Sequence, residues 1–405
     1  ITLTSGQLVI SDDLTIEGPG AEDLSIMGSG DRVFAIVPQA FADDPDGLFS
    51  PPSAEQLTDA PRVRIEKLSI ENGIATDAIG YDLAAGYAFG GGIYNMGGSV
   101  HLNRAHLSNN LAVGGLSAGG AIANEFGGEL TIERSRFENN TSSGVVVAVG
   151  GAITSDSGAT VEEDAPAGVT NPPVVDVSRS VFVGNTAETQ TGYVDEPQAA
   201  FSGVAGGGAI LNVTGALTIS RSHFEANSVF GGNAVADVPG LADSTTAGIG
   251  IGGAILSGNL SPFGFAQSTL MISRSTFEDN AATGGSGEAA GVEGGLAAGG
   301  AVAVGNGSDA TLERNHFDTN LSSGGAGVVG GIGTGGAVSA SDTARLGLQR
   351  NHFTKNTAEG GSGVDSDAAG RGGALGLDTI PLYGFGKTTF PDGSMPFAGP
   401  AIGSS

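Results

Sequence analysis

Short runs in which apolar and polar residues alternate recur along most of the chain. Residues 129–133 read Glu-Leu-Thr-Ile-Glu and residues 216–220 read Ala-Leu-Thr-Ile-Ser. A period of two places Leu and Ile on one face of an extended strand and Thr or Glu on the other. We therefore predict short, half-buried β-strands. Helices are expected to be nearly absent, because Gly or Pro interrupts the windows that have apolar residues at helical spacing.

Two short motifs alternate between about residues 90 and 375, and such self-similarity is typical of repeat architectures. The first is Gly-Gly followed by Ala and an aliphatic residue, and it begins at positions 119, 150, 207, 252, 299, 335 and 372, with a variant at 91. The second is Arg-x-x-Phe-x-x-Asn, with an earlier copy in which Leu107 replaces Phe. Its Phe and Asn residues are Phe137 and Asn140, Phe182 and Asn185, Phe224 and Asn227, Phe277 and Asn280, Phe317 and Asn320, and Phe353 and Asn356.

An aliphatic residue stands five positions before each motif Phe, as Ile132 does before Phe137. An odd offset puts two residues on opposite faces of one flat strand. We therefore predict a bend at the intervening Arg134 and Ser135, so that both apolar side chains point inward. Stacked units of this kind bury a continuous column that one unit alone cannot bury.

These observations predict an all-β, single-stranded parallel β-helix over residues 1–383, with the clearest repeats at 90–375 and a Gly- and Pro-rich tail at 384–405. A repeat of about 18 to 20 residues, with coils about 4.8 Å apart, predicts roughly 15 to 18 coils. Variable stretches such as 38–61, 155–173, 187–203 and 232–247 are rich in Gly, Ala, Ser, Pro and acidic residues, which is typical of surface loop insertions.

The motif residues are interpreted as scaffold. Each Phe is expected to stack with its counterparts in the core. Each Asn is expected at a turn, where it tolerates left-handed backbone and hydrogen-bonds neighbouring backbone groups. Each Gly-Gly pair would supply a positive φ at a corner and let the next coil approach closely, with the following Ala on the wall.

The polar residues beside the motif Phe are expected to face outward. Each motif Arg would lie on the outer side of a corner and pair with nearby acidic residues, and the alternative is a ladder of arginines that binds a ligand. Four His residues directly precede the motif Phe or Leu, but equivalent positions of alternating coils lie about 9 to 10 Å apart, too far for shared zinc coordination. The acidic residues are Glu133, Glu138, Glu278 and Glu313, and the His residues are His106, His223, His316 and His352.

Composition excludes several classes. The 405 residues carry a formal net charge of -27 from 43 acidic and 16 basic residues, which argues against nucleic acid and anionic membrane surfaces as partners. No run approaches the roughly 20 apolar residues of a membrane-spanning helix, so we expect no membrane insertion by this chain. The absence of Cys excludes disulfides and thiol chemistry.

Candidate metal ligands are confined to short acidic clusters in loops, since hard cations such as calcium favour oxygen ligands. The clusters are Asp43, Asp44 and Asp46, Glu162 to Asp164, and Asp365 with Asp367. None has the full spacing of a calcium loop, so calcium is a weak hypothesis beside simple solvated charge. No catalytic residue and no cofactor is predicted.

The alternation of Gly-Gly-Ala-Ile with Phe-x-x-Asn resembles the passenger domains of the chlamydial polymorphic outer membrane proteins and, more broadly, bacterial secreted right-handed β-helix proteins. The match covers roughly residues 90 to 375. The resemblance implies a right-handed solenoid, an extracellular or cell-surface location, and a structural or adhesive role with protein or surface contacts. An uncapped first coil at Ile1 and the Gly-rich tail add a subsidiary hypothesis, association into a homo-oligomer, filament or sheet.

The alternative function is a polysaccharide lyase or hydrolase on a β-helix scaffold. Such chemistry needs paired carboxylates, or acidic calcium ligands plus a base, within one sugar-binding groove. The first place to look is where Tyr81, Tyr87 and Tyr94 lie near Asp77, Asp82 and His101 in the sequence. Ice or mineral binding is a third class, which the missing Thr-x-Thr ladders disfavour.

Overall fold

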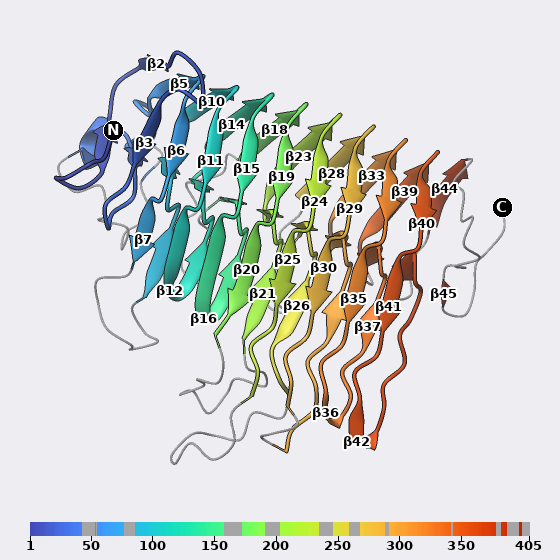
Figure 1. Cartoon of the computed structure of the whole chain (residues 1–405). Coiled ribbons are helices and arrows are strands. Elements are labelled where there is room, and N and C mark those ends of the chain that lie inside the picture. Colours follow the sequence, from blue (N-terminus) through green and yellow to red (C-terminus); the bar gives the residue numbers. More distant parts are fainter. Residues whose placement is uncertain are drawn as a thin grey trace.

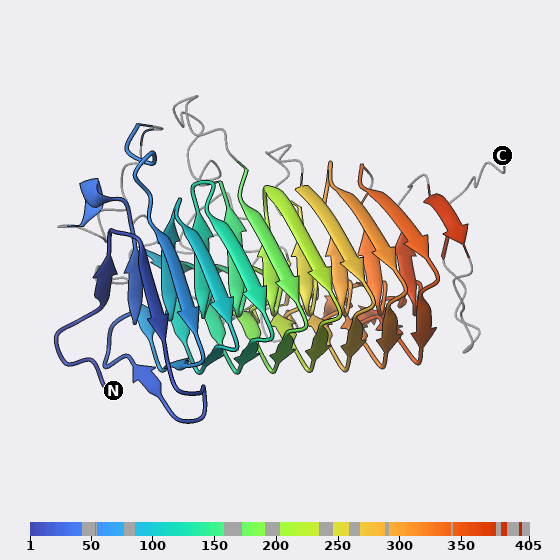
Figure 2. The ribbon, with the colours of Figure 1, turned by 90° about the horizontal axis from the view of Figure 1, so that it is seen from above.

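The computed structural model describes residues 1–42, 53, 55–76, 86–157, 172–190, 203–234, 246–258, 268–287, 291–341 and 343–377, with the backbone of 382–386 and 397–398. The chain winds into a parallel β-solenoid with four long sheets, and its first and last described coils lie at opposite ends of the rod (Figure 1). Seen from above, the coils follow one another in chain order along a single axis (Figure 2). One 3-10 helix, η1 (Gln39–Phe41), interrupts the described strands. The predicted all-β parallel β-helix is confirmed.

Each full coil visits sheets I, II, III and IV in that order. Sheet I contains β1 (Leu8–Ile10), β4 (Phe34–Ile36), β9 (Ile93–Met96), β13 (Ile122–Glu125), β17 (Ile153–Asp156), β22 (Ile210–Asn212), β27 (Ile255–Ser257), β32 (Val302–Val304), β38 (Val338–Ala340), β43 (Leu375–Leu377) and β45 (Phe397–Ala398). Sheet II contains β2 (Leu14–Glu17), β5 (Arg62–Glu66), β10 (Ser99–Asn103), β14 (Glu129–Glu133), β18 (Val174–Ser178), β23 (Gly215–Ser220), β28 (Ser268–Ser273), β33 (Asp309–Glu313), β39 (Arg345–Gln349) and β44 (Leu382–Gly386), the last of which spans the predicted boundary at residue 383.

Sheet III carries the motif Phe residues. It contains β3 (Ser25–Met27), β6 (Ser69–Glu71), β11 (His106–Ser108), β15 (Arg136–Glu138), β19 (Val181–Val183), β24 (His223–Glu225), β29 (Thr276–Glu278), β34 (His316–Asp318) and β40 (His352–Thr354). Sheet IV contains β7 (Ile74–Thr76), β8 (Tyr87–Phe89), β12 (Leu111–Ala118), β16 (Thr141–Val149), β20 (Thr186–Thr189), β21 (Val204–Gly206), β25 (Ser228–Phe230), β26 (Ile249–Ile251), β30 (Ala281–Thr283), β31 (Ala297–Ala298), β35 (Leu321–Ser323), β37 (Gly333–Thr334) and β41 (Thr357–Glu359).

The prediction of 15 to 18 coils is wrong, because sheet I has eleven strands. The stretch between each motif Asn and the next Gly-Gly pair forms the fourth side of the coil, sheet IV. One coil therefore takes one strand from each of sheets I, II and III and one or two strands from sheet IV. Successive motif Phe positions, 36 to 53 residues apart, lie one coil apart.

The core is a continuous column of apolar side chains. The rings of Phe137, Phe182, Phe224, Phe277, Phe317 and Phe353 are fully buried and stack in sequence, with neighbouring centroids 4.7 to 4.9 Å apart. A buried aromatic ring removes about 150–250 Å² from water, so this stack is a main source of stability. Ile132 and its counterparts are also buried, across the bend at residues 134 and 135. The inward placement of both residues is confirmed.

The Gly-Gly pairs behave as predicted at the corner between sheets IV and I. Gly119 has φ +66, and a Cβ at Gly120 would lie 2.2 Å from the carbonyl oxygen of Gly151 in the next coil. The first Gly therefore makes the turn and the second permits the close approach of coils. Ala121, which follows, is fully buried in the core wall.

Part of the variable insertions is more regular than the sequence predicted. After β25, β30, β35 and β41 the chain leaves sheet IV along a glycine arm and returns along a second one, forming a flat projection that we call the glycine fin (lower edge of Figure 1). Backbone hydrogen bonds of 2.8 to 2.9 Å link outgoing and returning arms in alternation, through Gly232, Gly248, Gly285, Gly295, Gly325, Gly331 and Gly361. The strands β36 (Gly327–Val329) and β42 (Gly363–Ser366) pair at its tip.

Glycine is required in the fin because the arms touch backbone to backbone. A Cβ at Gly325 would lie 1.8 Å from the carbonyl oxygen of Gly285, and one at Gly295 would lie 1.9 Å from that of Gly248. No side chain fits at these separations. The high glycine content thus serves two kinds of site, the tight corners and the fin.

Candidate functional site

Two corners of the coil are built alike and differ in the residues that they use. We call the turn between sheets II and III the arginine corner and the turn between sheets III and IV the asparagine corner. At each corner, from the second coil onward, one residue with a left-handed backbone precedes one that points into the solenoid. The left-handed residues have φ of 50 to 58° at the arginine corner and 52 to 63° at the asparagine corner. The two corners therefore impose the same backbone demand.

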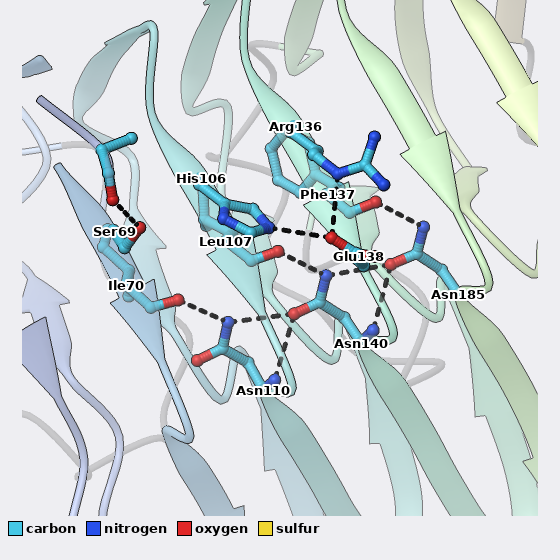
Figure 3. A network of polar contacts seen from close by, with 11 residues as sticks. Ser69, Ile70, His106, Leu107, Asn110, Arg136, Phe137, Glu138, Asn140 and Asn185 are labelled. Atoms are coloured by element: carbon cyan, nitrogen blue, oxygen red, sulfur yellow. Dashed lines mark hydrogen bonds and ion pairs between the residues drawn. The ribbon is translucent and has the colours of Figure 1, made fainter. Parts of the chain in front are cut away.

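At the asparagine corner the inner residue is almost constant. The amide Nδ2 of Asn140 donates to the carbonyl oxygen of Leu107 (3.0 Å) and to Oδ1 of Asn185 (2.9 Å), and the Asn140 backbone N–H also donates to Asn185 Oδ1 (3.1 Å; Figure 3). The same bonds continue through Asn227, Asn280, Asn320 and Asn356. Each buried amide thus satisfies backbone and side-chain groups of its neighbours, as buried polar groups must.

This ladder corrects one prediction about the motif Asn. The hydrogen bonds to backbone groups are confirmed, but the left-handed conformation belongs to the preceding residue. That outer position is occupied by Asn72, Asn109, Asn139, Gly184, Ala226, Asp279, Thr319 and Lys355. A position that must only tolerate φ near +50° is free to vary in this way.

At the arginine corner the pattern is reversed. The inner residue varies among Leu68, Ala105, Ser135, Ser180, Ser222, Ser275, Asn315 and Asn351. Where it is Ser, its hydroxyl accepts the backbone N–H of the preceding coil, as Ser222 Oγ does from Ser180 at 3.2 Å. The outer, left-handed residue is always a cation: Lys67, Arg104, Arg134, Arg179, Arg221, Arg274, Arg314 and Arg350. Consecutive coils set these residues about 4.8 Å apart in one straight row.

The row is exposed, and its centre is free of acidic partners. Arg134 lies 3.6 Å from Glu133 and Arg314 lies 2.9 Å from Glu313, so the expected pairing is confirmed at these two positions. Among the described residues, Arg179, Arg221 and Arg274 form no ion pair. The residues immediately before these three are Ser178, Ser220 and Ser273.

The outer face of sheet III beside the row carries a partly neutralised second layer. Arg136 Nε donates to Glu138 at 2.8 Å, and His106 Nε2 lies 3.2 Å from the same carboxylate (Figure 3). The hydrogen bond from Arg136 lowers the pKa of Glu138 and raises that of Arg136. The rings of His316 and His352 stack at 5.0 Å. The motif His residues are half-buried on this outer face.

Of the candidate metal ligands, the structure describes only Asp365 and Asp367. Asp43, Asp44, Asp46 and residues 162–164 lie outside the described residues. Asp365 and Asp367 are exposed at the tip of the fin, where Asp367 accepts the Gly363 N–H at 2.9 Å. Within the described ranges no group of three or more His, Asp or Glu side chains is placed to hold a metal ion. Calcium binding stays a prediction.

The region proposed for a hidden cleft is divided among three sheets. Tyr87 stacks on Phe89 in sheet IV, Tyr94 is buried in sheet I beneath the Arg32 guanidinium, and His101 lies on the outer face of sheet II. His101 lines a shallow depression of about 340 Å³ with Asp13 and Arg62. Tyr81, Asp77 and Asp82 lie outside the described residues.

A pair of carboxylates that the sequence reasoning missed lies on sheet I. Glu125 and Asp156 occupy the same register position of β13 and β17. Burial, and secondly the charge of Asp156, raises the pKa of Glu125 well above its ordinary value. The sequence contained a signal for this pairing, because both residues follow their Gly-Gly pair by the same number of positions. Their exposed fractions are 5% and 8%, so both residues are almost completely buried.

No protein-family model, curated protein or solved structure matches this chain. The coil geometry, the Asn and Ser ladders and the aromatic stack establish a parallel β-solenoid. None of the helices in the described part of the chain has the length and apolar character to span a bilayer.

Proposed function

We propose that this chain is a structural or adhesive rod of a bacterial surface or extracellular matrix, and that the arginine corner is its contact surface. The observation that carries the proposal is the constancy of the outer cation at a backbone position that elsewhere accepts six different residue types. The resemblance to passenger domains of polymorphic outer membrane proteins supports the location. A rigid stack of hydrogen-bonded coils suits the task, because it holds identical side chains in line without further loss of conformational entropy.

The first test determines whether the protein is exposed on the cell surface. Intact cells of the source bacterium are treated with an external protease, and the chain is followed by immunoblotting beside a cytoplasmic marker. Loss of the chain with retention of the marker supports the proposal, and protection of both contradicts it. Negative-stain electron microscopy of the released material, with and without calcium, then distinguishes single rods from filaments.

Self-association is a subsidiary part of the proposal. The exposed Val364 (72%) on strand β42 supports it, since exposed strands can pair with another chain. Sedimentation velocity over a wide concentration range tests it, and a strictly monomeric boundary at the highest concentration would exclude it.

A polysaccharide lyase or hydrolase is the alternative function. The Glu125 and Asp156 pair favours it, because two carboxylates in register on neighbouring strands match the paired carboxylates that glycoside cleavage needs. Incubation with a panel of polysaccharides, followed by measurement of new reducing ends and unsaturated products, tests it. Cleavage that disappears in Glu125→Gln would replace the first proposal.

A further inference from the structure

We propose that the arginine corner binds a linear acidic polysaccharide, whose carboxylates pair with guanidinium groups of the row. The inference rests on the adhesive function proposed above and names its partner class. Its centre is Arg179, Arg221 and Arg274, and the flanking positions Arg134 and Arg314 extend it.

The first argument is the identity of the outer residue. A left-handed backbone costs an L-residue roughly 1–2 kcal/mol, and Gly or Asn relieves this cost best. The asparagine corner uses Gly or Asn at four of its eight outer positions, whereas the arginine corner uses neither at any of its own eight. Because the backbone gains nothing from Arg at this position, its side chain is the part that matters.

The second argument is geometry. Parallel coils repeat at about 4.8 Å, so the guanidinium groups stand at regular intervals on one straight edge. A guanidinium presents a planar fork that binds a carboxylate through two hydrogen bonds. An extended glycan with one uronic acid per sugar carries carboxylates along its whole length, so several of them can face the row at once. Several weak contacts along one rigid ligand then add up to firm binding.

The third argument is the local charge. The chain as a whole carries -27, so a continuous row of cations is a marked exception on its surface. At the centre of the row the preceding residues are serines, whose hydroxyl groups suit a polyhydroxylated ligand. Acidic residues directly before the arginine reappear at Glu133 and Glu313. Asp176, Glu225 and Glu278 lie on the adjoining strands but form no ion pair with the three central arginines.

Nucleic acid fits the row less well. Binding of single strands relies on aromatic side chains that stack on the bases. The residues beside the central arginines on sheet III are Val181, His223 and Thr276, and the motif Phe rings are fully buried. The strongly negative net charge also opposes a polymer that binds mainly through its phosphates.

The experiment uses the full chain and a fluorescent homogalacturonan octasaccharide, titrated by fluorescence anisotropy at low and moderate salt. Its fully methyl-esterified form is the matched ligand, since it differs only in charge. We expect binding of the free acid that weakens as salt rises, and at least about tenfold weaker binding of the ester. Equal binding of both, or none to the acid, overturns the proposal.

Variants locate the binding. The triple variant Arg179→Gln, Arg221→Gln and Arg274→Gln keeps much of each side-chain stem and removes three charges, and we expect about tenfold weaker binding or more. The control variant, Arg62→Gln, Arg345→Gln and Arg371→Gln, changes the net charge equally at exposed positions away from the row and should bind within about twofold of the parent. Equal affinities of the two variants overturn the proposal.

Further readouts separate the other outcomes. Circular dichroism checks that the triple variant is folded, and Arg→Lys at the same three positions, which keeps the charge, should restore part of the affinity. Preferential binding of single-stranded DNA, or a dimer that the triple variant abolishes, would assign the row to another partner and overturn the proposal. Shortening of the octasaccharide during the titration would instead refute the non-catalytic function and leave the binding row standing.

Discussion

The two corners of this solenoid meet the same backbone requirement with opposite choices. At the asparagine corner the buried residue is Gly73 in the second coil and Asn in every later one, and the exposed residue varies. At the arginine corner the exposed residue is always a cation and the buried one varies. The backbone φ values are almost the same. A constraint on the buried side therefore points to stability, and a constraint on the exposed side points to function.

The buried residues differ because the two ladders have different numbers of groups to satisfy. Asn227 accepts both the N–H and the amide of Asn185, and donates to Phe182 and Asn280. The Ser222 hydroxyl accepts one N–H, from Ser180, and donates one hydrogen bond, to the carbonyl oxygen of Ser220. Fewer bonds depend on the serine hydroxyl, so Ala or Leu can replace it in the first coils.

The largest expected effect is at the asparagine corner. Asn227→Ala leaves the N–H and amide of Asn185 and the carbonyl of Phe182 without their partners, and should lower the free energy of unfolding by about 3–5 kcal/mol. Ser222→Ala at the arginine corner should cost about 1–2 kcal/mol. Chemical denaturation of both variants measures the difference. Equal losses would show that the two ladders are equally important and would break the comparison.

The glycine fin offers an intermediate test, since its contacts use no side chains at all. Gly325→Ala would place a Cβ 1.8 Å from the oxygen of Gly285, and we expect a loss of about 1–3 kcal/mol with faster amide exchange confined to the fin. Val329→Ala, at a more exposed position of the same arm, is the matched control. Unchanged exchange in Gly325→Ala would show that the arms do not pack as tightly as their hydrogen bonds imply.

A smaller effect concerns the outer residues themselves. Arg221→Gly and Ala226→Gly both relieve a left-handed backbone, so each should raise the free energy of unfolding by up to about 1 kcal/mol. Similar gains would show that Arg221 has no special role in stability. A clear loss in Arg221→Gly alone, measured by thermal denaturation, would mean that the arginine stems hold the corner together and would weaken the functional interpretation.

Glu125 is a buried acid that lies outside both corners and belongs to neither hydrogen-bond ladder. Its effect on stability can therefore be compared with that of the corner residues. The folded-state pKa of Glu125 is raised, so the folded protein holds this proton more tightly than the unfolded chain does. The corresponding stability is complete below the unfolded value, near pH 4.5, and is lost as pH rises toward the folded pKa. We expect Glu125→Gln to be more stable than the parent at neutral pH and to lose this advantage near pH 4. Parallel thermal melts from pH 4 to pH 8 would show a constant difference if Glu125 were solvated.

Much of the fold could be predicted from local pattern. The period of two predicted the strands of sheet II, and the offset of five between Ile132 and Phe137 predicted the bend between sheets II and III. The Gly-Gly pairs predicted the corner between sheets IV and I. Sheet IV was missed because its strands, such as the residues of β25 and β30, are short and lie beside long insertions. Without that sheet, the number of coils was overestimated.

The candidate site was only partly visible in the sequence. The recurrence of Arg before each Phe was evident, and a ligand-binding ladder was one of two interpretations. The left-handed backbone conformation of these Arg residues was not evident in the sequence, because the conformation of a residue at a bend depends on how two sheets meet. The pairing of Glu125 with Asp156 was likewise hidden by their separation of 31 residues, although the Gly-Gly motif gives them the same register.

The sequence by itself determined which residues recur and therefore that identical side chains would stack, because a solenoid converts sequence periodicity into spatial rows. Only the tertiary structure decided how many strands close one coil, which residue of each bend takes the left-handed conformation, and that glycine arms from successive coils pair as a fin. The reason is that these features depend on contacts between coils 36 to 53 residues apart, where backbone hydrogen bonds and the missing Cβ atoms set the separation.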